Sequence, residues 1–338
     1  MTIKLCVVMD PIQHIKTKKD STFSLILEAQ KRQWAIYYVE ASQLFLVDNQ
    51  VKGSVSHIHV KDSPIDFVDF LDSEPRTVSL SEFNIILMRK DPPFNVAYLY
   101  ATYLLELAER AGCLILNRPS SLRDANEKLF TTWFSQCCPP TLVTSQIHLV
   151  KQFTAKHHKI IIKPLHSMGG QGVLMVNEGD LNLHSIVELL THRGKYPIMA
   201  LIKIAALTVN RLNTAASIAD TRISQISQSG DKRILMIDGT PYPYALARIP
   251  SKEDFRGNLA SGADGIKHEL TARDRWLCEQ VSPTLKEKGL FFVGLDVIGD
   301  FITEINVTSP TGVREIENLF NINIAAVILD KLTEKIKS

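Results

Sequence analysis

The chain has 338 residues, of which 45% are hydrophobic and 22% are charged, as expected for a globular protein large enough for two or three cores. A formal net charge of +2 argues against a nucleic-acid or anionic-membrane partner, because such partners require a concentrated basic face. Any anionic ligand must therefore be held by a few local groups.

The N-terminal apolar run is interrupted at Asp10, so it is too short for a signal peptide or a membrane span. The cysteines are odd in number and show no paired metal-ligand spacing, which indicates free thiols in a reducing cytoplasm. The adjacent Cys137-Cys138 pair could be reactive, but a plain structural role is the favoured interpretation. The five cysteines are Cys6, Cys113, Cys137, Cys138 and Cys278.

The first 120 residues alternate short apolar runs with stretches of helical spacing. Strands that alternate with helices are typical of a parallel α/β layer, so we expect such a layer here. A Ser/Thr cap is expected to open the first helix. The predicted strands are 5–9, 35–39, 85–88 and 114–116, and the predicted helices are 21–32 and 97–111.

The pattern changes after Ser120, where a helix is predicted over 121–134 and is broken by Pro139-Pro140. Strands predicted at 160–164 and 173–176 flank a glycine-bearing loop, which indicates a hairpin-like unit. We therefore divide the chain into an N-terminal α/β domain, a central domain and a C-terminal domain. Their predicted bounds are 1–122, 123–200 and 201–338.

The C-terminal half has the mixed pattern of an α+β region. Its first stretch, at about 201–225, is rich in Ala, Thr, Ser and Asn and has no assignable structure. Two hairpins and two helices are expected beyond it, with a disturbance of the first helix at Pro283. The predicted strands are 233–238, 242–248, 291–297 and 301–306, and the predicted helices are 276–288 and 316–335.

The last predicted hairpin carries Asp296, Glu304 and Asn306 among apolar neighbours. Glu304 and Asn306 are two residues apart, so they share one face of a strand, and pairing across the turn could bring Asp296 beside them. Two carboxylates and an amide oxygen are hard ligands that suit Mg²⁺. The alternative is a solvated polar face, but the flanking apolar residues favour a metal site.

Lys163 ends a strand of three isoleucines and precedes a loop of Ser167, Met168, Gly169, Gly170, Gln171 and Gly172. A lysine that emerges from a buried strand needs an anionic partner, and glycines let backbone N–H groups approach phosphate oxygens. The loop lacks the ending of a Walker motif. These residues alone leave two interpretations open, a nucleotide site and an ordinary turn with a lysine reaching water.

Four further cationic residues have different sequence surroundings. For Lys128, which falls on a predicted helix, a solvated surface side chain is the default. Arg233 and Arg248 each border an apolar strand, and guanidinium groups suit phosphate and carboxylate. Arg89 follows an apolar strand directly, at the end where open parallel sheets bind ligands. No nucleophile–base arrangement or zinc motif is evident in the sequence.

Together these segments resemble the bacterial glutathione synthetase family over nearly the whole chain. Two of them, Met-Arg-Lys-Asp-Pro-Pro and Glu-Ile-Asn-Val-Thr-Ser-Pro, separate this family from its ATP-grasp relatives. The segments that carry the resemblance are 10–11, 18–22, 87–94, 117–119, 122–124, 127–130, 163–165, 168–170, 230–233, 247–250, 256–260, 294–299 and 303–310.

The resemblance implies an ATP-grasp fold preceded by a parallel-sheet domain, with ATP held between the central and C-terminal sheets. It implies that Lys128, Lys163 and the loop Ser167 to Gly172 contact the nucleotide. It also implies that Asp296, Glu304 and Asn306 hold two Mg²⁺ or Mn²⁺ ions. By the same resemblance, Arg233 and Arg248 are catalytic, and Arg89, Asn306 and Ser309 meet the peptide substrate.

The implied reaction joins γ-glutamylcysteine to glycine with ATP, through an acyl phosphate, in a cytoplasmic homotetramer. One departure stands out: 201–225 replaces the adenine-contacting hinge of the family and is longer by about twenty residues. The insertion either loops out of the hinge or damages the adenine pocket. Two other interpretations therefore stay open, a sister ATP-grasp ligase with other substrates and a nucleotide-binding protein of reduced activity.

Overall fold

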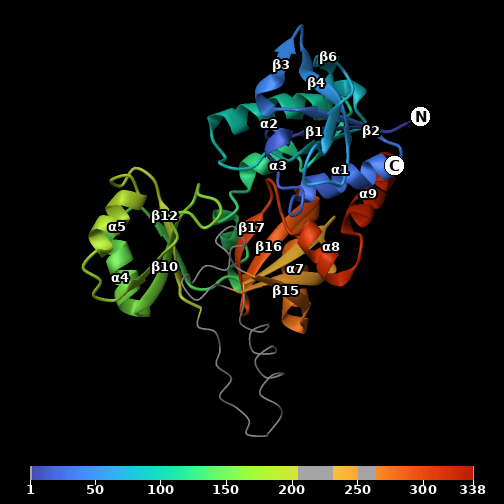
Figure 1. The fold of residues 1–338 in the computed structure, drawn as a ribbon. Helices are drawn as coiled ribbons and strands as arrows, with labels where there is room; N and C mark the ends of the chain where they lie inside the picture. Colours follow the sequence, from blue (N-terminus) through green and yellow to red (C-terminus); the bar gives the residue numbers. More distant parts are fainter. Residues whose placement is uncertain (1, 205–230, 250–263, 338) are drawn as a thin grey trace, which may run out of the picture.

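The computed structural model describes residues 2–204, 231–249 and 264–337, which form three β-sheets with helices packed around them (Figure 1). The expected insertion at 201–225 lies outside the described residues beyond position 204. Among the helices that the structure describes, none combines the length and the apolar character needed to cross a bilayer.

The N-terminal sheet has a parallel centre, as predicted. Strands β1, β2, β7 and β8 run parallel, in the order β2-β1-β7-β8. Asp20, rather than a Ser or Thr, caps α1, since its carboxylate accepts the Phe23 N–H at 2.7 Å. The bounds are β1 Lys4–Val8, α1 Ser21–Lys31, β2 Ala35–Val39, β7 Ile85–Met88, α2 Val96–Arg110 and β8 Leu114–Leu116.

Four antiparallel strands extend this sheet beyond the predicted parallel layer. A two-residue turn at Asp48 and Asn49, both with positive φ, joins β3 to β4, and β4 pairs with β2 and with two further strands. None of these four strands was predicted from the sequence. They are β3 Leu44–Val47, β4 Gln50–Val60, β5 Val68–Phe70 and β6 Arg76–Ser79.

The helix predicted over 121–134 is wrong, because the chain leaves the helix in the middle of that range. Helix α3, Pro119–Asp124, ends there, and a 3₁₀ helix, Leu129–Trp133, follows it. Between them, the Asn126 side chain accepts the N–H groups of Lys128 at 3.2 Å and Leu129 at 2.9 Å. This local capping competes with a continuous helix. It leaves residues 125–128 free to reach other parts of the molecule.

The central sheet is antiparallel, with the order β11-β10-β12-β9, and the predicted hairpin of β10 and β11 is confirmed. Helices α4 and α5 pack against it around a small apolar cluster that includes Val150, Ile162 and Val187. The bounds are β9 Thr141–Thr144, α4 Ile147–His157, β10 Lys159–Pro164, β11 Leu174–Asn177, α5 Leu183–Leu190 and β12 Ile198–Ile202.

The C-terminal sheet is antiparallel as well, in the order β15-β14-β13-β16-β17, and both predicted hairpins are confirmed. Helix α7 continues through Pro283, so the expected disturbance does not end it. The helix predicted over 316–335 is split at Asn321, which adopts a left-handed conformation. The bounds are β13 Asp231–Ile237, β14 Thr240–Ile249, β15 Asp264–Glu269, α7 Ala272–Glu287, β16 Phe292–Ile298, β17 Phe301–Asn306, α8 Val313–Phe320 and α9 Ile324–Lys335.

The N-terminal and C-terminal sheets share their apolar cores. One buried cluster joins Val8 of β1 to Leu295 of β16, and another joins Leu25 of α1 to Leu329 of α9. Helix α9 lies beside α1 in Figure 1, at the end of the molecule opposite the central sheet. The last helix of the chain therefore holds the two terminal regions together.

Candidate active site

Lys163 connects the central sheet to the C-terminal sheet. It lies in β10, its side chain is buried, and its Nζ donates to the backbone carbonyl of Thr303 in β17 at 2.7 Å. Burial lowers the pKa of Lys163, and the carboxylate of Glu304 opposes that shift. A cation from the central sheet therefore reaches the hairpin of β16 and β17, which carries the predicted metal ligands.

Lys128 is buried too, so its interpretation as a solvated surface lysine is wrong. It stands at the start of the 3₁₀ helix Leu129–Trp133, and its side chain points between the two sheets. Its Nζ donates to the backbone carbonyl of Ser167 and lies 3.1 Å from Oε1 of Glu304. Lys128 therefore links the glycine loop to the acidic strand.

The loop between β10 and β11 depends on its glycines. Gly169, Gly170 and Gly172 all have positive φ. At Gly172 a Cβ atom would also lie 2.9 Å from Cγ of Pro164, so a larger residue would meet both strain and a clash. Ser167 donates to the carbonyl of Pro164 at 3.2 Å. Met168 and Gln171 form the turn itself, because the Gln171 N–H donates to the Met168 carbonyl at 3.0 Å.

Arg233, Asp296 and Glu304 stand directly opposite one another on β13, β16 and β17. Arg233 forms a two-pronged ion pair with Asp296, with Nε 2.5 Å from Oδ1 and Nη2 3.0 Å from Oδ2. Asn306, two residues beyond Glu304, donates from Nδ2 to the Gly294 carbonyl at 3.1 Å. The antiparallel register thus aligns the three predicted metal ligands, as expected from the hairpin.

Arg248 completes the charged cluster from β14. Its Nη2 lies 2.7 Å from Oδ1 of Asp231 and 3.0 Å from Oδ1 of Asp296. Burial alone would raise the pKa of Asp296, but Arg233 and Arg248 hold it below the ordinary value. For Asp231, burial outweighs the attraction of Arg248 and raises the pKa to about 6.

The donor set suits a hard divalent cation. Among the residues that the structure describes, no group of three or more His, Cys, Asp and Glu side chains gathers as a metal site. The predicted set instead has two facing carboxylates and one amide, whose oxygens are the ligands that Mg²⁺ accepts alongside water and phosphate. Asp296 and Glu304 are paired here with Arg233 and Lys128, and an anionic nucleotide would compete for those cations.

Arg89, directly after β7, meets Ser309, which lies just beyond the end of β17. Arg89 is buried, and its guanidinium donates to Thr22 Oγ1 and to the Pro310 carbonyl, both at 2.9 Å. Ser309 Oγ donates to the Arg89 carbonyl at 3.3 Å. The structure therefore brings together two predicted substrate residues that are 220 positions apart.

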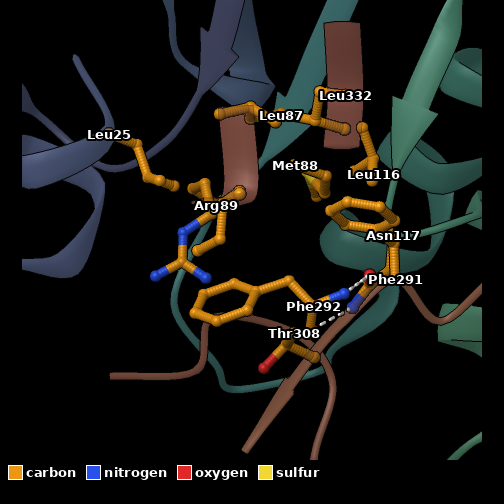
Figure 2. A pocket seen from close by; sticks show the side chains of 11 residues that line it. Leu25, Leu87, Met88, Arg89, Leu116, Asn117, Phe291, Phe292, Thr308 and Leu332 are labelled. Carbon is orange, nitrogen blue, oxygen red and sulfur yellow. Dashed lines mark hydrogen bonds between the residues drawn. The ribbon is translucent and has the colours of Figure 1, made fainter. Parts of the chain in front are cut away.

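A small pocket lies behind Arg89, among apolar side chains of the N-terminal and C-terminal regions (Figure 2). Figure 2 shows the Phe292 ring close to Arg89, with Asn117 bonded to the Phe292 backbone. At about 20 Å³ the pocket has room for about one water molecule. It is too small for the predicted substrates, so it lies behind the candidate site and does not bind them.

The sequence interpretation missed Asp231, Glu127 and Thr308, which all contact predicted site residues or their neighbours. Asp231 precedes Lys232-Arg233 in one of the segments that carry the resemblance, so its position was a usable signal. Glu127 and Thr308 also lie in such segments, 127–130 and 303–310, but their contact joins residues 181 positions apart and could not be predicted from either segment.

Comparisons with known proteins agree with these observations. The family model for the N-terminal domain of prokaryotic glutathione synthetase matches residues 3–123, and the model for its ATP-grasp domain matches residues 127–208 and 202–321. The glutathione synthetase of Coxiella burnetii is 47% identical over 335 residues, which cover 99% of this chain and 98% of that protein. The enzyme of Vibrio vulnificus strain YJ016 is 46% identical over 338 residues, covering 100% of this chain and 99% of that protein.

Solved structures with the same fold are more distant in sequence. D-cycloserine synthetase DcsG has a TM-score of 0.65 at 12% identity, with 98% of this chain and 99% of that chain covered. The ATP-grasp ligase PsnB, complexed with a minimal precursor, has a TM-score of 0.58 at 17% identity, with 99% and 98% covered. At such identities the likeness shows the fold alone, and it confirms the predicted ATP-grasp architecture.

Proposed function

The chain belongs to the prokaryotic glutathione synthetase family, and from this premise we propose how its residues share the reaction. It is an ATP-dependent ligase that joins γ-glutamylcysteine to glycine and gives glutathione, ADP and phosphate. The cysteinyl carboxylate attacks the γ-phosphorus, an acyl phosphate forms, and the glycine amine displaces phosphate. The observation that carries the residue assignment is the meeting of Lys163 and Lys128 with β17.

Lys128, Lys163 and the loop Ser167 to Gly172 bind the triphosphate of ATP in this proposal. Both lysines are buried and donate to backbone carbonyls, which are weak partners for a buried cation, and Lys128 also pairs with Glu304. Phosphate oxygens are stronger acceptors, so nucleotide binding replaces those bonds. The glycines of the loop allow its backbone N–H groups to approach the phosphates and to exclude water from the acyl phosphate.

Asp296, Glu304 and Asn306 hold Mg²⁺ or Mn²⁺, with two ions as the expected number. When bound, the ions neutralise charge on the phosphates and orient them. The support is the alignment of hard oxygen donors on two neighbouring strands, beside the lysines that face the triphosphate.

Arg233 and Arg248 stabilise the phosphoryl group as it is transferred, and then the acyl phosphate. Both guanidinium groups are buried and fixed by Asp296 and Asp231, so they need little reorganisation as charge develops. The reaction requires no side-chain nucleophile, because the substrate carboxylate attacks directly. The contribution of the protein is positioning and charge neutralisation.

Arg89, Asn306 and Ser309 bind the dipeptide. Arg89 offers a buried guanidinium for a carboxylate, and Ser309 lies beside it. Asn306 shares its strand with Glu304, so it joins the dipeptide site to the metal site. This arrangement sets the cysteinyl carboxylate close to the phosphates.

The domain bounds 1–122, 123–200 and 201–338 remain our proposal, supported by one sheet in each of the three regions. We place the protein in the cytoplasm, since all five cysteines are free thiols. We propose that ATP binding is retained despite the insertion at 201–225, because the family match continues on both sides of it.

We further propose a homotetramer, as the family resemblance implies. Helix α2 exposes Val96, Tyr100, Tyr103 and Leu107, which follow one another at helical spacing and are 39% to 63% exposed. A tyrosine-rich apolar stripe is suited to a self-complementary contact with a second copy. Changing Tyr100 and Tyr103 to Glu should lower the mass measured by sedimentation, and an unchanged mass would rule this face out.

A coupled ADP-release assay tests the function. ADP release should occur only when both γ-glutamylcysteine and glycine are present, so omitting either one should abolish it. Release with γ-glutamylcysteine and a different amine would favour a sister ligase. An intact fold with millimolar or absent ATP binding would favour a protein of reduced activity.

A further inference from the structure

Glu127 joins the N-terminal half of the chain to the end of β17 through a single carboxylate oxygen. Its Oε1 accepts three bonds, from the N–H of Val307 at 2.9 Å, the N–H of Thr308 at 3.0 Å and the hydroxyl of Thr308 at 2.8 Å. Its backbone carbonyl also accepts the N–H of Ile305 at 2.8 Å. Glu127 therefore holds three of the four residues from 305 to 308 at the end of the strand, and Asn306 is the exception.

The segment held by Glu127, residues 307–310, connects the proposed metal strand to the proposed dipeptide site. Arg89 holds its far end through the Pro310 carbonyl at 2.9 Å, and Ser309 donates back to the Arg89 carbonyl. Asn117 holds the near end, since its Nδ2 donates to the Val307 carbonyl at 2.7 Å. The segment is thus fastened at both ends, and Glu127 supplies most of the bonds at the near end.

The bonds to Glu127 are costly to lose. Burial and the nearby Glu304 raise the pKa of Glu127, while the bonds from Thr308 and Val307 oppose that rise. Removing the carboxylate would leave two backbone N–H groups and one hydroxyl, all partly buried, without their hydrogen-bond acceptor. The segment would then be free to shift relative to Arg89.

We propose that Glu127 is a positioning residue for the ligation, which sets the place of Ser309 relative to Glu304 and Asn306 through segment 307–310. The inference rests on the proposed assignment of Arg89 and Ser309 to the dipeptide. Glu127 acts as a hydrogen-bond acceptor, so its charge is dispensable. We expect ATP binding to be independent of the Glu127 side chain. Lys128 donates to the Ser167 carbonyl and Lys163 to the Thr303 carbonyl, and neither bond involves the Glu127 carboxylate.

Initial-rate kinetics of three variants test the proposal. Glu127→Ala should raise KM for γ-glutamylcysteine by about tenfold or more, with KM for ATP changed less than about twofold. Glu127→Gln keeps an acceptor oxygen in the same place and should stay within about threefold of the unchanged protein. Glu74→Ala, at an exposed glutamate, is the matched control and should behave like the unchanged protein.

A second pair of variants keeps the test decisive if Glu127→Ala does not fold. Thr308→Val removes only the hydroxyl bond and should raise KM for the dipeptide, whereas Thr308→Ser retains that bond and should not. Equal values for the two Thr308 variants would overturn the proposal. So would a Gln variant as impaired as the Ala variant, or equal increases of KM for ATP and for the dipeptide.

Arg89→Ala separates this inference from the proposed function. If it leaves KM for γ-glutamylcysteine unchanged, the dipeptide assignment is wrong and the inference falls with it. If Arg89→Ala raises that KM while Glu127→Ala does not, the dipeptide site stands and only the role of Glu127 is refuted.

Discussion

The central sheet and the C-terminal sheet are attached to the rest of the molecule in different ways. The central sheet has its own apolar cluster, and side chains of Lys163, Lys128 and Asn126 join it to other regions through hydrogen bonds. The C-terminal sheet shares two continuous apolar clusters with the N-terminal region. Figure 1 shows the consequence, with the central sheet standing apart from the other two.

This difference matches the demands of the reaction. An interface that binds a charged nucleotide and its metal ions must be polar, because apolar side chains cannot solvate phosphate groups and cations. A surface that holds substrate residues from distant parts of the chain must be rigid, and a shared dry core gives that rigidity. We therefore expect substitutions at the polar junction to affect turnover and substitutions in the shared core to affect stability.

The largest effect is expected for Glu304→Ala at the polar junction. It removes a proposed metal ligand and the carboxylate next to Lys128, so turnover should fall by roughly 10³- to 10⁴-fold while the melting temperature changes little. A coupled ADP assay over a range of Mg²⁺ concentrations measures it. Normal turnover at ordinary Mg²⁺ would refute the metal assignment.

A large loss of stability is expected for Asp274→Asn, behind the C-terminal sheet. The carboxylate of Asp274 is fully buried between Lys232, at 2.5 Å, and His268, at 3.0 Å. Leaving Lys232 without that charge should lower the free energy of unfolding by about 3–5 kcal/mol. Urea denaturation measures the change, and midpoints that agree between the two proteins would contradict it.

The same ion pair gives a pH dependence with a definite sign. Burial alone would raise the pKa of Asp274, but His268 and Lys232 hold it well below the ordinary value of 3.8. A lowered pKa contributes stability above the unfolded value, and that contribution is lost as the pH falls below about 4. The unchanged protein should therefore lose about 1 kcal/mol more stability on acidification from pH 5 to 3 than Asp274→Asn does, and equal losses would contradict this assignment.

A paired core experiment sharpens the comparison between the two attachments. Leu295 lies in a shared cluster and Ile162 lies in the central cluster, and both are fully buried. Replacing either residue by Ala should cost about 2–4 kcal/mol. Hydrogen exchange should increase across the N-terminal and C-terminal regions for Leu295→Ala, but only within the central sheet for Ile162→Ala. If hydrogen exchange increased over the same regions in both variants, the central and C-terminal sheets would be attached to the rest of the molecule in the same way.

The smallest effect is expected for Asp124→Asn at the surface. Asp124 ends α3, a helix that packs on α2 of the N-terminal region, and it pairs with Lys288 of the C-terminal region at 2.8 Å. Its side chain is 64% exposed. Solvent screening limits the change to at most about 0.5 kcal/mol, and added salt should abolish it. A cost above about 1 kcal/mol would mean that surface charge, and not the shared core, holds these regions together.

Much of the chain could be predicted because the relevant interactions are local. The strand–helix alternation of the first 120 residues located β1, β2, β7 and β8, and two-residue periodicity with a short turn aligned Asp296 with Glu304. Strands β3 to β6 were not predicted, and their place in the sheet depends on pairing with β4, which also pairs with β2. The helix at 121–134 was wrong because the capping by Asn126 outweighed helical spacing.

By itself, the sequence determined the parallel strands of the first region, the hairpins of the later regions, the family and the types of residue available for phosphate, metal and peptide. Only the tertiary structure decided that Lys128 is buried, that Arg89 meets Ser309, and that the oxygen of Glu127 holds the end of β17. The physical reason is separation along the chain. Strand pairing and capping depend on neighbours a few residues away, whereas these contacts depend on how whole sheets pack.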